Sequence, residues 1–204
     1  MHAGLIADFG GVLTTSFEGA LRSFCVREGL AADSLEKIFS VDAGAHGALK
    51  DLERGEIEQA EFVAYLAPAL GVQPDRLLER MLADLRSEPV VFDAVQRLRS
   101  RGVKVCVLSN SWGTSPFDPY GPFDLEANYD AVVISHQVGL RKPEKQIFAL
   151  AADKLGLEFD QCVFIDDVAH YLDAASALGM EVVHAVEPKN TVAALNELFD
   201  HSGP

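Results

Sequence analysis

The feature that most constrains this chain is a short apolar run that ends in a carboxylate and two glycines, Leu5-Ile6-Ala7-Asp8-Phe9-Gly10-Gly11. An apolar run without polar alternation is typical of a strand that is buried on both faces, as in parallel sheets. Ligands of such sheets bind in the crevice beyond the carboxyl ends of the strands, and Asp8 directly follows this strand. Asp8 is therefore a candidate functional carboxylate, with an ordinary Asp-initiated turn as the alternative.

From Pro89 onward, helical patterns alternate with short apolar runs. The expected strands cover residues 103–108, 131–135, 162–165 and 181–184, and the expected helices cover residues 89–101, 143–155, 169–178 and 191–199. Strands that alternate with helices of this length form a parallel sheet with helices on both faces. The predicted fold class is therefore α/β, with a doubly wound parallel sheet.

Residues 15–86 show helical periodicity alone. The clearest helix carries Phe62, Leu66 and Leu70 at four-residue spacing and ends at Gly71, and another helix is expected over residues 74–85. No strand pattern occurs in this block of the sequence. The sequence therefore predicts a small all-helical domain of residues 15–86, inserted after the first strand into an α/β core of residues 1–14 and 87–204.

The chain is strongly acidic, with a formal net charge of −14 over 204 residues. Nucleic-acid binding depends on Lys and Arg side chains that neutralise phosphates, so this charge argues against a nucleic-acid partner. It also disfavours an anionic substrate, unless a metal ion or a local cluster of cations reverses the field at the site.

Neither membrane insertion nor secretion is expected from the sequence. No apolar run approaches the ~20 residues of a membrane-spanning helix, and the first apolar run is too short for a signal peptide and lacks a basic flank. Cys25, Cys106 and Cys162 show no metal-site spacing and are expected to be buried free thiols. These observations predict a cytoplasmic protein that does not bind membranes.

Polar residues suited to catalysis stand at the ends of several expected strands. Asp8 follows the first strand, Ser109 follows the second, Asp166-Asp167 follow a later one, and Lys142 lies at the start of a helix. Because parallel strands point their carboxyl ends the same way, these side chains are expected to converge. Three carboxylates, a hydroxyl and an ammonium around one point suit a divalent hard cation and a phosphate group.

At these residues the sequence resembles the haloacid dehalogenase-like hydrolase superfamily, which is dominated by phosphatases. The four motifs of that family match, in order, residues 8–13, Ser109 after an apolar strand, Lys142 within residues 139–143, and the acidic pair Asp166-Asp167. Each motif is weak alone, but four in order at strand ends form a specific combination. The resemblance covers residues 3–13 and 89–199, and the helical block matches in position the family's small cap domain.

The resemblance implies a magnesium-dependent phosphatase that acts on a small phosphorylated metabolite. Asp8 would be the nucleophile and would carry the phosphoryl group as an aspartyl-phosphate, which water then hydrolyses. The metal ion would bind Asp8, the backbone carbonyl of Gly10 and Asp167, with Asp166 binding it directly or through another ligand.

The resemblance also assigns the groups that surround the phosphate. Ser109 and the backbone amide of Asn110 would hold phosphate oxygens, and Lys142 would orient Asp8 and neutralise part of the acidic cluster. The structural alternatives are an ordinary turn at Ser109 and a solvated helix start at Lys142.

The sequence departs from the family pattern at Gly10, where the phosphatases carry a second Asp that protonates the leaving alcohol and later activates water. Losing a general acid–base group typically costs ~10²–10⁴ in rate. Three functions stay open: a phosphatase that takes its acid from elsewhere or needs none, a 2-haloacid dehalogenase-type hydrolase, and a weakly active or non-catalytic binding relative. The acidic pair together with Lys142 favours the phosphatase, because the dehalogenase branch resembles a metal-free site.

Weaker candidates surround this constellation. His170 is a possible substitute acid or a polar residue at a helix start, and Trp112 either stacks on a substrate ring or packs its loop. Tyr171 stands where many relatives carry Asn or Asp, which puts the geometry around the metal in question. Three polar residues of the helical block are either surface groups or face the site: His46, Lys50 and Arg54.

Overall fold

The computed structural model describes residues 2–200, whose strands form one parallel sheet in the order β3-β2-β1-β4-β5. The bounds of the strands are β1 (Gly4–Ala7), β2 (Lys104–Ser109), β3 (Ala131–Ile134), β4 (Cys162–Asp166) and β5 (Glu181–His184). Strand β1, whose residues are all buried, lies at the centre of the sheet and pairs with β2 and β4. The doubly wound α/β fold predicted from the sequence is confirmed.

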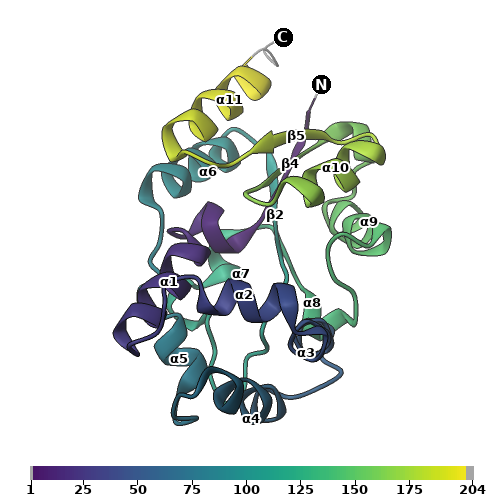
Figure 1. The fold of residues 1–204 in the computed structure, drawn as a ribbon. Helices are drawn as coiled ribbons and strands as arrows, with labels where there is room; N and C mark the ends of the chain where they lie inside the picture. Colours follow the sequence, from purple (N-terminus) through teal and green to yellow (C-terminus); the bar gives the residue numbers. More distant parts are fainter. Residues whose placement is uncertain (1, 201–204) are drawn as a thin grey trace.

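Helices cover both faces of the sheet (Figure 1). Alternate residues of β1 point to opposite faces, so that Leu5 and Ala7 belong to one apolar cluster and Ile6 to the other. The first cluster includes residues of α6 (Pro89–Ser100) and α11 (Pro188–Asp200), and the second includes residues of α9 (Lys145–Leu155) and α10 (Ala169–Ala177). This two-sided burial explains why the strands are apolar without alternation.

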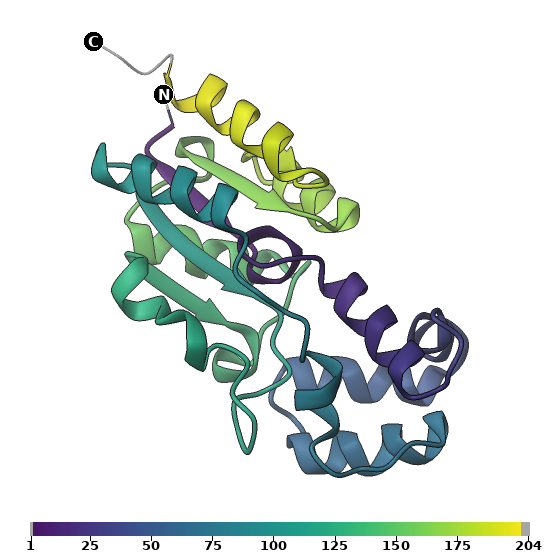
Figure 2. The same ribbon diagram turned by 90° about the vertical axis from the view of Figure 1, so that its left-hand side faces the viewer.

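Between β1 and β2 the chain forms a group of helices at one end of the molecule, away from α11 (Figures 1 and 2). We call residues 15–86 the cap segment, and its helices are α1 (Phe17–Arg27), α2 (Ser34–Val41), α3 (Ala43–Glu53), α4 (Gln59–Leu70) and α5 (Leu77–Met81). The chain enters and leaves this segment side by side, because Thr14 and Ser87 form an isolated bridge. The division into a core and a cap domain at these residues stays a prediction.

One helix of the cap segment is shorter than the sequence predicts, and another, α3, forms although Gly44 and Gly47 lower its helix propensity. The helix expected over residues 74–85 is only the short α5, because Arg76 takes a left-handed conformation with φ 48° just before it and Leu82 ends it. The glycine-containing α3 is a full helix, because the Asp42 side chain accepts hydrogen bonds from the Gly44 and Ala45 amides at its start.

The remaining described elements are short. They are η1 (Phe9–Leu13), η2 (Gly121–Phe123), α7 (Leu125–Asn128), α8 (Ser135–Val138) and η3 (Phe159–Gln161). Cys25, Cys106 and Cys162 are buried and free, as the sequence predicts. Within residues 2–200, every helix is too short or too polar to span a bilayer.

Candidate active site

The carboxyl ends of three neighbouring strands bring the sequence-predicted residues together. Asp8 directly follows β1, and its amide donates to the Ile165 carbonyl of β4 at 2.9 Å. Ser109 is the last residue of β2 and Asp166 the last of β4, so both flank the end of the central strand. The sheet order therefore gathers groups that lie more than a hundred residues apart in the chain.

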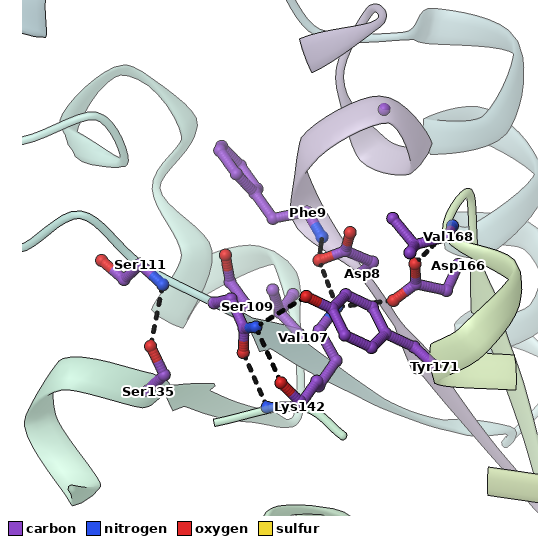
Figure 3. Close-up of polar contacts among 12 residues, drawn as sticks. Asp8, Phe9, Val107, Ser109, Ser111, Ser135, Lys142, Asp166, Val168 and Tyr171 are labelled. Atoms are coloured by element: carbon purple, nitrogen blue, oxygen red, sulfur yellow. Dashed lines mark hydrogen bonds and ion pairs between the residues drawn. The ribbon is translucent and has the colours of Figure 1, made fainter. Parts of the chain in front are cut away.

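Lys142 joins two of these carboxylates in the interior. Its ammonium lies 2.8 Å from Asp8 Oδ1 and 2.5 Å from Asp166 Oδ2, and the Lys142 side chain is 1% exposed (Figure 3). The Tyr171 ring lies 5.0 Å from the ammonium. Burial alone would lower the pKa of Lys142, but Asp166 and Asp8 raise it, so the side chain stays charged.

Asp8, Asp166 and Asp167 form a cluster in which one oxygen from each side chain lies within 4.8 Å of the others. Burial raises the pKa of Asp8 to about 8 and that of Asp167 to about 6, and Asp166 adds to both shifts while Lys142 opposes them. One ammonium thus leaves part of the negative charge unbalanced. An oxygen-only donor set with excess negative charge fits a hard divalent cation.

The three carboxylates are not equivalent as potential ligands. Asp166 is occupied by protein donors, because Oδ2 accepts from Lys142 and Oδ1 accepts from the Val168 amide at 2.8 Å. Asp8 Oδ1 accepts from Lys142 and from the Phe9 amide at 2.7 Å (Figure 3). Asp8 Oδ2 and the partly exposed Asp167 are therefore the carboxylate atoms best placed to hold a cation directly.

The structure requires glycine at only one of the two positions that follow Phe9, Gly10 and Gly11. Gly11 has φ 81°, and a Cβ atom there would lie 2.3 Å from Asp167 Oδ2, so glycine is required for the close approach of that carboxylate. Gly10 has φ −74° and ψ 122°, which any residue adopts, and a Cβ atom there would meet the Phe17 ring at 3.4 Å. The backbone therefore does not require glycine at position 10.

Ser109 and Asn110 lie beside the charged cluster, each held by neighbouring side chains. The Ser109 and Tyr120 hydroxyls share a hydrogen bond of 2.9 Å. Asn110 Oδ1 accepts from the Lys142 amide at 2.8 Å, and its Nδ2 donates to the Lys142 carbonyl and the Tyr171 hydroxyl, each at 3.2 Å. Tyr171 thus contacts Asn110 and Lys142.

The cap segment reaches the site through residues that the sequence analysis did not single out. Glu53, at the end of α3, is 6% exposed and accepts from Arg141 Nε at 2.5 Å. Burial raises the pKa of Glu53, and the Arg141 guanidinium opposes that shift. Gln59 of α4 donates to the Trp112 carbonyl at 2.9 Å. These contacts tie the cap segment to the loops after β2 and before α9.

A cavity of about 490 Å³ lies where the cap segment meets the strand ends. One part of its lining, called the polar lining here, consists of Asp8, Ser109, Asn110, Lys142 and Asp167. Another part, called the apolar lining, consists of Phe17, Leu82, Leu85 and Trp112. Two carboxylates from the cap segment, Glu18 and Glu53, also face the cavity. Within the described residues that line it, Lys142 is the one Lys or Arg.

Of the weaker candidates from the sequence, some line the cavity or contact the core, and others lie away from the cavity. Trp112 lines the cavity and packs edge-on against Phe17, with ring centroids 5.0 Å apart. Arg54 pairs with Glu144 on the core. The other three do not belong to the described cavity lining, and two of them are exposed: His46, Lys50 and His170. Neither Glu53 nor Tyr120 has a sequence signal that marks it, because each reaches the cavity only through tertiary packing.

Comparisons with known proteins add to this geometry. A sequence model of the haloacid dehalogenase-like hydrolases matches residues 3–179. The HAD family enzyme BT-2542 of Bacteroides thetaiotaomicron has a TM-score of 0.70 and 24% identity, over 97% of this chain and 98% of that chain. That enzyme has also been solved in complex with magnesium and inorganic phosphate.

Two curated relatives differ in how much of them this chain spans. Phosphatase MT3486 of Mycobacterium tuberculosis is 28% identical over 157 residues, which make up 71% of this chain and 72% of that protein. Acyl-CoA dehydrogenase family member 10 of Mus musculus is 26% identical over 206 residues, which make up 97% of this chain but only 19% of that protein. The chain thus spans about a fifth of the mouse protein's length.

Proposed function

The chain belongs to the haloacid dehalogenase-like hydrolases, and from that premise we propose that it is a magnesium-dependent phosphatase acting on small phosphorylated metabolites. One observation carries the proposal: the buried Asp8 carboxylate is held by Lys142 beside two further carboxylates. Such a cluster is stable only if cations balance it, and a bound divalent ion turns an acidic site into one that accepts phosphate. The relative from M. tuberculosis that is named a phosphatase supports this reaction class.

The chemistry begins with Asp8. One of its carboxylate oxygens attacks the phosphorus atom of the substrate, the bond from phosphorus to the leaving oxygen breaks, and an aspartyl-phosphate forms. Ser109 and the backbone amide of Asn110 hold phosphate oxygens, and Lys142 orients Asp8 and favours its ionised form. Water then attacks the phosphorus atom, inorganic phosphate leaves, and the Asp8 carboxylate is restored.

Magnesium would be held by Asp8, the Gly10 carbonyl and Asp167, with Asp166 supporting the site through Lys142. When bound, it neutralises the charge of the transferring phosphoryl group and of the carboxylates. A divalent ion bound at this cluster would allow a chain with a net charge of −14 to accept an anionic substrate.

The alternative reaction is that of a 2-haloacid dehalogenase-type hydrolase, and Gly10 is the observation that favours it. In that chemistry Asp8 attacks a carbon atom and halide leaves, so no alcohol has to be protonated. The acidic cluster argues against it, because without a metal ion the single Lys142 ammonium faces three carboxylates, and Asp166 and Asp167 raise the pKa of the nucleophile Asp8.

The test compares the wild type with Asp8→Asn on phenyl phosphate, with and without magnesium. We expect metal-dependent phosphate release that EDTA abolishes and that Asp8→Asn reduces by on the order of 10³-fold or more. Asp93→Asn, at an exposed position of α6, is the matched control and should retain its activity.

Two outcomes would overturn the phosphatase proposal. One is an Asp8→Asn variant that keeps half of the wild-type rate while its melting temperature matches the wild type. The other is metal-independent release of chloride from 2-chloropropionate in the absence of any phosphate release.

A further inference from the structure

We propose that the substrates of this site are small aryl phosphate monoesters, in which the leaving group is a phenol that bears no second anionic group. This inference rests on the proposed phosphatase function and narrows its substrate class. Two independent features of the cavity lead to it: the lack of a carboxylic acid beside the nucleophile, and the chemistry of the lining around it.

The first feature is Gly10, which supplies no proton donor next to Asp8. An aspartate side chain would be sterically possible there, because the backbone is extended and the nearest atoms that a Cβ at this position would meet belong to the Phe17 side chain, at 3.4–3.6 Å. The Phe17 side chain thus lies next to position 10, where the phosphatases of the family carry an acid. An alkoxide leaves poorly without protonation, whereas a phenolate carries its charge into its ring and needs no acid.

The cap carboxylates do not replace the missing acid in this arrangement. Glu53 Oε2 accepts from Arg141 Nε at 2.5 Å and lies 3.5 Å from Asn110 Nδ2, so a guanidinium and an amide already engage this oxygen. Glu18 is exposed and pairs with Arg22 at 2.6 Å. Both carboxylates are thus hydrogen-bonded to arginine side chains of the protein.

The second feature is the apolar lining together with its charges. Phe17 and Trp112 meet edge to face, and Phe62 continues the aromatic contact beyond Trp112 at 6.0 Å. Leu82 and Leu85 complete a surface that suits a planar apolar ring. Because the Lys142 ammonium is already bound to carboxylates, nothing in the described lining offers a free cation to a second anionic group, and the cap segment adds two carboxylates, Glu18 and Glu53, to that lining.

The size of the cavity points to a small molecule. Its volume of about 490 Å³ lies in the lower part of the range of ~300–1,000 Å³ that is typical of small-molecule pockets. The cap segment contributes Phe17, Leu82 and Leu85 to its lining, so the ring of the substrate is expected to lie under the cap segment.

The proposed first step needs no proton donor from the protein. Asp8 forms a bond to phosphorus, the bond between phosphorus and the phenolic oxygen breaks, and the aryloxide departs with the electron pair. The aryloxide takes its proton from solvent after release. Water then cleaves the aspartyl-phosphate, and the proton it loses passes to the phosphate product or to solvent.

The first experiment compares kcat/KM of the wild-type protein, with magnesium, for phenyl phosphate and benzyl phosphate. The two esters share the same ring, but the leaving group of phenyl phosphate is a phenolate and that of benzyl phosphate is an alkoxide. We expect phenyl phosphate to be preferred by ~10²-fold or more, the scale of missing acid catalysis. Equal rates, or a preference for benzyl phosphate, would overturn the proposal while leaving the phosphatase function standing.

The second experiment tests charge with 4-carboxyphenyl phosphate, whose leaving group is better than phenol itself. We expect its KM to exceed that of phenyl phosphate by ~10-fold or more, and Glu18→Gln to narrow this ratio. A lower KM for the carboxylated ester, or a preference for choline phosphate over phenyl phosphate, would show that the lining recognises a charged leaving group, and the proposal would be wrong.

The third experiment excludes a hidden acid with Glu53→Gln. If Glu53 supplies the proton, this variant loses activity on benzyl phosphate but not on phenyl phosphate, and the inference falls. If Glu53 only supports the fold, the ratio between the two esters stays as in the wild type. Should no phosphate ester turn over in the wild type at all, the phosphatase function fails, and this inference fails with it.

Discussion

The polar and the apolar lining of the cavity differ in where the chain supplies them and in how they are held. The polar lining comes from strand ends and the segment before α9, and its central ion pair joins Lys142, at 1% exposure, to Asp8 and Asp166. The apolar lining comes mostly from the cap segment, where Phe17 is partly exposed and contacts Trp112 without any fixed polar partner. We therefore expect the residues at the strand ends to determine the reaction and the cap segment to determine the choice of substrate.

The largest effect is expected where the polar lining is held most tightly. Lys142→Met leaves Asp8 and Asp166 buried without their cation, and the free energy of unfolding is expected to fall by ~3–5 kcal/mol. Chemical denaturation measures this loss, with the exposed Lys145→Met as a control that should change stability by less than ~0.5 kcal/mol. A Lys142→Met protein as stable as the control would mean that the polar lining is not held by this ion pair.

A smaller effect is expected where the two linings meet, at Gly10. Gly10→Asp places a carboxylic acid beside the leaving oxygen, so the rate on benzyl phosphate is expected to rise by up to ~10²-fold, with little change on phenyl phosphate. Steady-state kinetics on both esters measures the difference. If both rates rise alike, the substitution acts through metal binding or folding. The lack of a proton donor at position 10 would then not explain a difference in rate between the two esters.

The smallest effect is expected in the apolar lining itself. Phe17→Leu removes one ring contact, worth ~0.5–1.5 kcal/mol, so KM for phenyl phosphate should rise by ~2–10-fold with kcat nearly unchanged. Phe39→Leu is the matched control, because Phe39 packs on Phe62 outside the described cavity lining. A large loss of kcat in Phe17→Leu would show instead that Phe17 takes part in positioning the reacting groups.

The sheet and the polar lining could be predicted from the sequence because both depend on local patterns. Apolar runs without alternation indicate buried parallel strands. The sheet order then brings Asp8, Ser109 and Asp166 to the same edge of the sheet, whatever the conformation of the segments that connect the strands. The roles assigned to these side chains stay predictions, but their proximity follows from the fold.

The apolar lining could not be predicted in the same way. Leu85 belongs to a helical pattern in the sequence, but it faces the cavity from outside α5, because Arg76 and Leu82 shorten that helix. Glu53 and Gln59 carry no motif, and only the packing of the cap segment brings them to Arg141 and the loop after β2. Contacts of this kind depend on tertiary structure and leave no periodic signal.

The central claim, that Asp8 carries the phosphoryl group, is tested most directly by trapping that intermediate. Because Gly10 also deprives the second step of its base, phenyl phosphate should phosphorylate the protein faster than water releases the phosphate. Acid quenching after rapid mixing with magnesium should show a burst of one phenol per protein, and peptide mass spectrometry should locate one phosphoryl group on Asp8 and none in Asp8→Asn. Phenol release without any phosphoryl group on Asp8, or the group on another residue, would contradict the account.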